Sequence, residues 1–353
     1  MTLYDNPLYQ SDVARVANAM PLERVAEKSI VISGATGLVG SFLVDAALEK
    51  DANENAKLEI YALTRKPDAA RRRFARYAES PRLHFVQYDA SQPFDGKSIP
   101  RADYVLHLAS NTHPIQYATD PIGTVMTNVL GLRNLLEFAC ARNAARFAFA
   151  SSNEIYGENR GDVELFTEDY CGYVDCNTTR AGYPESKRCG EALCNAYNSQ
   201  RGLDFVIPRL TRSYGPTMLA SDSKAISQFI KKGVARENIV LKSAGTQFYS
   251  YTYVADAVSG LLCALFSGAS GEAYNIADEA SDITLRELAA TIAEYAGKEV
   301  VFEIPDAVES SGYSKATKAR LDGAKLRALG WRPVYDVRTG VRRTIDILRA
   351  IQE

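Results

Sequence analysis

Short runs of apolar and β-branched residues alternate with longer segments of helical periodicity through the first two-thirds of the chain. This alternation is typical of a parallel sheet with crossover helices, so it predicts a doubly wound α/β fold. The apolar runs predict strands at Ser29–Ser33, Glu59–Leu63, Leu83–Val86, Tyr104–Leu108, Arg146–Ala150 and Asp204–Pro208. Helical periodicity predicts helices at Leu38–Leu48, Thr124–Arg142 and Tyr183–Arg201.

After Pro208 the pattern becomes less regular. It predicts helices near Ser223–Val234, Val254–Phe266, Leu285–Ala296, Asp322–Leu329 and Val337–Ala350, and a tyrosine-rich stretch at Phe248–Tyr253. We therefore expect a large domain over residues 27–210 to which residues 236–276 return. Residues 211–235 and 277–353 would form a smaller lobe, and residues 1–26 an N-terminal extension.

Composition and charge narrow the classes of partner. With 46% hydrophobic and 24% charged residues, the chain reads as an ordinary globular protein. Its formal net charge of −2 argues against a nucleic-acid or anionic-membrane partner, because both normally require a basic excess.

The cysteines and the termini indicate the compartment. The six cysteines show no Cys-x-x-Cys pair and no histidine at zinc-site spacing, so we expect no metal site and a reducing environment. The first twenty residues lack the apolar core of a signal peptide, and no later stretch is long and apolar enough to span a bilayer. A cytoplasmic protein is the expectation.

A glycine-rich turn, Gly34-Ala-Thr-Gly37-Leu-Val-Gly40, directly follows the first predicted strand and opens a helix. Its backbone amides and the helix N-terminus suit a pyrophosphate, so the turn predicts nicotinamide dinucleotide binding. The second strand is followed by Thr64-Arg65-Lys66 where an acidic residue often accepts the adenosine ribose hydroxyls, and these cations could neutralise a 2′-phosphate. NAD is expected and NADP is not excluded. Asp89 suits either an adenine contact or a turn.

The segment Tyr183-Pro-Glu-Ser-Lys187 places a phenol and an ammonium four residues apart, on one face of a helix. A lysine beside a phenol favours the phenolate, which can take a proton near neutral pH. An isolated tyrosine, with a pKa of about 10, stays protonated there and cannot act as a base. The spacing alone also fits a solvated helix face. The glycine-rich turn, and the Ser151-Ser-Asn-Glu154 segment that precedes Tyr183, favour an acid–base pair.

With the glycine turn, Ser152, Tyr183 and Lys187 in chain order, the chain resembles the extended short-chain dehydrogenase/reductases that modify nucleotide sugars, the NAD-dependent epimerase/dehydratase family. Within that family it is similar to UDP-glucuronate decarboxylases. The likeness rests on His107-Leu-Ala-Ser110, Pro121-Ile122, Thr127-Asn128, Gly131 and the segment Arg180–Arg188. It implies a Rossmann-type dinucleotide-binding domain, a substrate-binding lobe and a homodimer formed through two helices, Thr124–Arg142 and Tyr183–Arg201.

The resemblance also implies roles for individual residues. Tyr183, as phenolate, would take the proton of a sugar C4 hydroxyl while hydride leaves to the nicotinamide, with Ser152 bridging and Lys187 holding the ribose. Residues implied at the cofactor are Gly34, Thr36, Gly37, Leu38, Val39, Gly40, Thr64, Arg65, Asp89, Ala90, Leu108, Ala109, Ser110, Asn128, Tyr183, Lys187 and Leu210. Residues implied at a nucleotide-diphosphate sugar substrate are Ser110, Asn153, Arg180, Arg212 and Tyr249.

Glu154 bears on the fate of the oxidised sugar. It stands where decarboxylases and 4,6-dehydratases carry a glutamate, and as a base it could remove the C5 proton or assist ring distortion. Asn153 stands where dTDP-glucose 4,6-dehydratases place an aspartic acid, and an amide cannot protonate a leaving hydroxyl. Decarboxylation or dehydration is therefore expected, with C4 or C5 epimerisation as an alternative and a non-catalytic dinucleotide-binding sensor as a further one.

Two positions depart from the decarboxylase pattern. Arg212 replaces an asparagine that usually touches the substrate diphosphate region, and Tyr249 replaces an arginine that usually lies at the substrate. We expect Arg212 to supply the diphosphate or carboxylate contact in place of the missing arginine. A solvated loop arginine is the alternative interpretation of Arg212.

Overall fold

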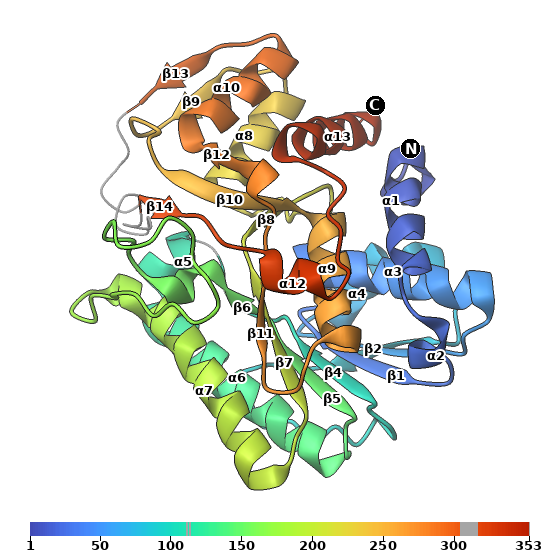
Figure 1. The fold of residues 1–353 in the computed structure, drawn as a ribbon. Helices are drawn as coiled ribbons and strands as arrows, with labels where there is room; N and C mark the ends of the chain where they lie inside the picture. The colour runs from blue at the N-terminus through green and yellow to red at the C-terminus, as the bar shows by residue number, and fades with distance from the viewer. Residues whose placement is uncertain (111, 113, 304–316, 353) are drawn as a thin grey trace.

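The large sheet lies at the centre of this computed structural model, which describes residues 1–110, 112, 114–303 and 317–352 (Figure 1). Its strand order is β11-β7-β5-β4-β1-β2-β3, with β6 paired to β7, and every pairing is parallel. The strands are β1 (Ser29–Ser33), β2 (Glu59–Thr64), β3 (Leu83–Gln87), β4 (Tyr104–His107), β5 (Arg146–Phe149), β6 (Ser151–Ser152), β7 (Phe205–Leu210) and β11 (Ala273–Ile276). The predicted doubly wound α/β fold is confirmed.

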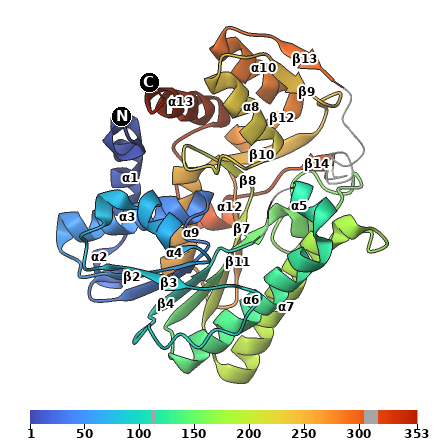
Figure 2. The ribbon, with the colours of Figure 1, turned by 180° about the vertical axis from the view of Figure 1, so that it is seen from behind.

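Helices cover both faces of this sheet, as Figures 1 and 2 show. One face carries α3 (Leu38–Glu54) and α9 (Val254–Ser267), and the other carries α6 (Pro121–Ala141) and α7 (Gly182–Arg201). Successive residues of β1 alternate between two cores: Ile30 and Ile32 join the cluster that contains α3 and α9, and Val31 joins the cluster that contains α6. Side-chain alternation along a strand, with both faces buried, explains why these strands are continuously apolar.

A smaller lobe sits above the carboxyl ends of the large sheet (Figure 1). Its four-stranded sheet has the order β12-β10-β14 with β8 paired to β10, and a two-stranded sheet joins β13 to β9. The strands are β8 (Arg212–Tyr214), β9 (Ile239–Leu241), β10 (Phe248–Tyr253), β12 (Asp282–Thr284), β13 (Val300–Phe302) and β14 (Lys318–Ala319). The helices are α8 (Ala225–Val234), α10 (Leu285–Ala296) and α13 (Val337–Ala350).

The segment 236–276 divides its elements between the sheets. Its last strand, β11, belongs to the large sheet, while β9 and β10 belong to the two smaller ones. The domain boundaries expected from the sequence stay predictions. The remaining short elements are η1 (Leu3–Asp5), α2 (Leu22–Val25), α4 (Pro67–Arg73), η2 (Ala75–Tyr77), α5 (Pro114–Thr119), η3 (Asn153–Tyr156), η4 (Thr179–Ala181), η5 (Glu279–Ser281) and α12 (Ala324–Ala328).

The N-terminal helix α1 (Pro7–Asn18) packs against α3, α9 and α13 and so links the large domain to the lobe (Figure 2). The buried carboxylate of Asp12 accepts hydrogen bonds from the hydroxyls of Tyr253 at 2.7 Å and Tyr335 at 2.8 Å, and from Arg343 Nε at 2.8 Å. Because this carboxylate satisfies three groups of the lobe, the extension fixes how the lobe sits on the sheet.

Candidate active site

A cavity of about 1280 Å³ lies where the carboxyl ends of the parallel strands meet the lobe. This edge is the usual ligand site of a doubly wound sheet. The cavity is lined by Gly34, Thr36, Gly37, Leu38, Val39, Gly40, Thr64, Arg65, Asp89, Ala90, Leu108, Ala109, Ser110, Ser152, Asn153, Glu154, Arg180, Tyr183, Lys187, Leu210, Arg212 and Tyr249. The predicted site residues therefore converge on one cavity, with one exception.

The exception is Asn128, which lies behind the cavity wall. It is 1% exposed, accepts a hydrogen bond from Ser110 Oγ at 2.7 Å and donates one to Ser186 Oγ at 2.8 Å. Ser110 lines the cavity and Ser186 precedes Lys187 on α7. Asn128 therefore joins α6 to α7 and supports the residues that reach the cavity.

The glycine-rich turn has the shape that a dinucleotide needs. Gly34 has a φ of +71°, and a Cβ there would come within 2.8 Å of the Ala109 backbone nitrogen. A Cβ on Gly40 would lie 2.2 Å from the Gly34 carbonyl oxygen, so the first turn of α3 packs tightly against the loop. Gly37, the N-cap of α3, lines the cavity without a side chain to cover the helix amides. These residues fit a pyrophosphate.

The far end of the same cavity is basic. Arg65 and Lys66 follow the last residue of β2, Thr64, and are exposed. Asp89 accepts hydrogen bonds from the Ser91 backbone nitrogen at 2.9 Å and from Ser91 Oγ at 2.8 Å, and these bonds hold its pKa below the usual range. Asp89 thus shapes a turn and also faces the cavity, so both interpretations of this residue are compatible with its position.

Tyr183 is 6% exposed at the N-terminal end of α7. The pKa of its phenol is about 12, raised chiefly by burial and also by the charge of Glu154. Hydrogen bonding with Ser152, the charge of Arg180 and hydrogen bonding with Ser110 oppose this rise. Strand β6 pairs with β7 and holds Ser152 beside the tyrosine, where its hydroxyl also accepts from the Glu154 backbone nitrogen at 3.2 Å. Both serines therefore lower the pKa of Tyr183, as its role as a general base requires.

Lys187 lies one helical turn further along α7 and is 3% exposed. Its Nζ donates to the Ala150 carbonyl oxygen at 2.9 Å and lies 6.0 Å from the centre of the Tyr183 ring. Burial lowers the pKa of this ammonium to about 8, against the opposing charge of Glu191. A buried ammonium that is held by a carbonyl and faces a cavity is typical of a functional lysine.

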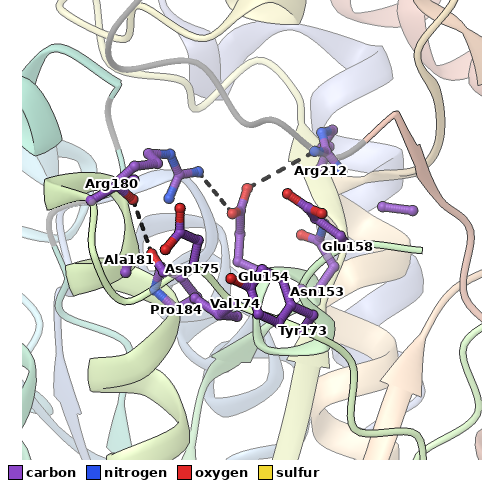
Figure 3. A pocket seen from close by; sticks show the side chains of 13 residues that line it. Asn153, Glu154, Glu158, Tyr173, Val174, Asp175, Arg180, Ala181, Pro184 and Arg212 are labelled. Atoms are coloured by element: carbon purple, nitrogen blue, oxygen red, sulfur yellow. Dashed lines mark hydrogen bonds and ion pairs between the residues drawn. The ribbon is translucent and has the colours of Figure 1, made fainter. Parts of the chain in front are cut away.

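Glu154 lies between two arginines, as Figure 3 shows. Arg180 Nη2 is 2.7 Å from Glu154 Oε2, and Arg212 Nη2 is 3.9 Å from Glu154 Oε1. Arg212 also lies over the ring of Tyr249, with its guanidinium carbon 3.4 Å from the ring centre. The four residues come from η3, η4, β8 and β10 and form one charged wall of the cavity.

Two features of the site were not predicted from the sequence: Tyr117 and the ion pair between Arg209 and Glu191. Tyr117 is buried, with its ring centre 4.8 Å from that of Tyr183 and the guanidinium of Arg180 4.8 Å from its own ring. It lies on the six-residue helix α5, which is too short to produce a periodic signal. The buried Arg209 pairs with the partly buried Glu191, 2.6 Å from Nη2 to Oε2, one helical turn beyond Lys187. The spacing of Glu191 four residues after Lys187 was the available signal.

Comparison with known proteins assigns the family. Residues 30–277 match the model of the NAD dependent epimerase/dehydratase family. The chain belongs to this family. UDP-glucuronic acid decarboxylase 3 of Arabidopsis thaliana is 31% identical over 88% of this chain and 86% of its own length. UDP-glucuronic acid decarboxylase 1 of Xenopus tropicalis is 30% identical over 93% of this chain and 75% of its own length.

Solved structures agree with the fold. A DesIV double mutant, a dTDP-glucose 4,6-dehydratase from Streptomyces venezuelae with NAD and DAU bound, has a TM-score of 0.77 and 25% identity over 91% of this chain and 96% of its own. UDP-glucuronic acid 4-epimerase from Bacillus cereus has a TM-score of 0.78 and 21% identity over 92% of this chain and 99% of its own. Membership of an NAD dependent family confirms the predicted cofactor class and enzyme class.

Metal-binding clusters and membrane-spanning helices are both lacking in the described part of the chain. No group of three or more histidine, cysteine, aspartate or glutamate residues in it is placed to hold a metal ion. None of the helices in the same residues has the length and apolar character required to cross a bilayer.

Proposed function

We propose that this enzyme oxidises a nucleotide-linked sugar at C4 and then decarboxylates it. The observation that carries the proposal is the convergence of Ser152, Tyr183 and Lys187 with the glycine-rich turn on one cavity. Relatives that match most of the chain are UDP-glucuronic acid decarboxylases, which favours decarboxylation over the other reactions of the family. Uridine and glucuronate are accordingly the first base and sugar to test.

The residues suit the first step. When bound, NAD supplies an acceptor for the hydride of the sugar C4–H and later returns it. Tyr183 Oη takes the proton of the C4 hydroxyl, and Ser152 holds that hydroxyl while donating to the phenolate. Lys187 places a positive charge beside the ring and so favours the phenolate. The turn Gly34–Gly40 holds the pyrophosphate of the cofactor.

The second step depends on the resulting ketone at C4. A carbonyl at C4 accepts the electron pair of the C5–C6 bond, so a carboxylate on C5 leaves as carbon dioxide and C5 then takes up a proton. Glu154, held between Arg180 and Arg212, orients the ring for this step. In a dehydration Glu154 would instead remove the C5 proton. Asn153, which lines the same wall, has no acidic proton to give a departing C6 hydroxyl, and this disfavours dehydration.

Product mass after incubation with NAD and a panel of nucleotide sugars tests the proposal. Decarboxylation yields a product lighter by the mass of carbon dioxide, dehydration one lighter by the mass of water, and epimerisation an unchanged mass with altered stereochemistry. The Tyr183→Phe variant keeps the ring and removes the acid–base group, so it should bind NAD without converting sugar. No conversion of any sugar by the unmodified chain would support a non-catalytic sensor.

We also infer a homodimer in a reducing compartment. Helices α6 and α7 pack side by side, and Ile122 and Met126 on α6 are 78% and 44% exposed, which suits an apolar contact with a second copy. Cys171, Cys176 and Cys189 are exposed free thiols, which suits the cytoplasm. The molar mass in solution tests the dimer.

A further inference from the structure

The charged wall formed by Arg180, Glu154, Arg212 and Tyr249 holds more positive than negative charge. Both guanidinium groups face the single carboxylate of Glu154, and the three side chains are between 12% and 20% exposed. Charges removed from water need partners nearby, because desolvation penalises each of them. One carboxylate balances one of the two guanidinium charges.

Each guanidinium also has one buried nitrogen, Arg180 Nε and Arg212 Nη1, that has no hydrogen-bond partner among the described residues. The other two carboxylates beside this wall, on Glu158 and Asp175, already have contacts of their own. Glu158 lies 4.0 Å from Arg160, and Asp175 accepts from the Asn177 backbone nitrogen at 3.1 Å.

Arg212 is held in place by its neighbour on the paired strand. Strands β8 and β10 are parallel with Tyr251 opposite Arg212, so Tyr249 lies two residues earlier on the same face of β10. The guanidinium stacks on the buried Tyr249 ring, a contact that fixes its plane and leaves its edge for a second partner. A planar guanidinium presented edge-on suits the two oxygens of a carboxylate.

We propose that Arg212, stacked on Tyr249 and acting with Arg180, binds a carboxylate on the substrate sugar. The substrate class is then a nucleotide-linked hexuronate. Among the described residues, the uncompensated charge of the wall is about one unit, which matches one carboxylate and falls short of a diphosphate. Arg212 lies 3.9 Å from Glu154, the residue assigned to the sugar ring. The inference rests on the proposed function and adds the group that selects the substrate.

Binding measurements separate this inference from turnover. In the Tyr183→Phe background, with NAD present, calorimetry compares UDP-glucuronate with UDP-glucose, which differ only at C6. The starting protein should prefer the uronate. Adding Arg212→Gln should weaken uronate binding by about 10- to 100-fold, the usual effect of losing a charge-assisted hydrogen bond, and leave UDP-glucose binding unchanged.

The stacking residue gives a second, independent variant. Tyr249→Phe keeps the ring and should keep the preference for the uronate, whereas Tyr249→Leu removes the platform and should reduce it. Arg212→Lys keeps the charge without the planar edge and should recover only part of the affinity. Arg201→Gln is the matched control: it removes an exposed arginine at the C-terminal end of α7 that lines neither cavity, and it should leave both affinities unchanged.

Three results would overturn the inference. They are equal binding of the two sugars by the starting protein, no binding of UDP-glucuronate, and an equal loss for both sugars in Arg212→Gln, which would place Arg212 at the diphosphate. NAD affinity of each variant reports correct folding. Failure of the proposed function would instead be seen as absence of conversion by the chain that retains Tyr183, whatever the binding preference.

Discussion

Replacing Lys187 with methionine measures the cost of burying an ammonium in the active site. Burial lowers its pKa to about 8 from the ordinary 10.5, against the opposing charge of Glu191. The unfolded chain therefore holds this proton more tightly than the folded chain does. Because one pH unit corresponds to about 1.36 kcal/mol, the buried charge costs roughly 3 kcal/mol of unfolding free energy below pH 8.

The sign of the pH dependence follows from proton binding. Between pH 8 and 10.5 the unfolded chain binds about one proton more at this site, so stability rises with pH. The methionine variant lacks this contribution. The variant also loses the hydrogen bond from Lys187 to the Ala150 carbonyl, which costs roughly 1–3 kcal/mol. This loss lowers the unfolding free energy equally at every pH and does not change how the unfolding free energy varies with pH. The difference in unfolding free energy between the unmodified protein and Lys187→Met should therefore change by about 3 kcal/mol between pH 8 and 10.5.

Urea unfolding at a series of pH values, followed by circular dichroism, measures this difference. Lys50→Met is the matched control, because Lys50 is equally buried at 3% exposed but lies 2.5 Å from the Glu54 carboxylate and does not line the cavity. The control should keep the steep rise above pH 8 that Lys187 contributes. Parallel curves for the unmodified protein and Lys187→Met would refute the reasoning.

Three further predictions concern other groups. Burial lowers the pKa of His107 to about 3 from 6.5, so acid destabilises the fold as pH falls below 6.5, and His107→Gln should flatten that loss in urea unfolding at acid pH. Ser152→Ala raises the pKa of Tyr183, so it should shift the pH–rate profile of sugar oxidation to higher pH and lower the rate at neutral pH by about 10- to 100-fold. Ser152→Thr keeps the hydroxyl and should restore both the profile and the rate. Asp12→Ala should lower the unfolding free energy, measured by urea unfolding, by about 3–5 kcal/mol, because it removes the acceptor of the Tyr253 and Tyr335 hydroxyls and of Arg343 Nε.

Most of the large sheet could be predicted because its signals are local, although β6 and β11 were not predicted. Each predicted strand begins within one residue of the observed one, since a strand buried on both faces is a continuous apolar run. Helix α10 was predicted to the residue because Thr284 and Glu287 form a capping box and Gly297 ends the helix with a positive φ. Helix α3 runs six residues beyond its predicted end, supported by the ion pair between Lys50 and Glu54.

The lobe and the charged wall depend on contacts between distant segments. Strands β8, β9, β12, β13 and β14 have two or three residues each, too few for an alternating pattern. The pairing of β8 with β10 brings Arg212 to Tyr249, and the ring contact with Tyr183 depends on where α5 packs. The sequence indicated Arg212 and Tyr249 as departures from a family pattern, but their stacking required the pairing of strands.

Conversion of UDP-glucuronate that carries deuterium at C4 tests the central claim most directly. Oxidation at C4 followed by decarboxylation predicts a slower reaction than with the unlabelled sugar, and a product lighter by the mass of carbon dioxide that keeps deuterium at C4. The Tyr183→Phe variant should form no such product. Equal rates for the two substrates, or the same product from Tyr183→Phe at an undiminished rate, would contradict the account.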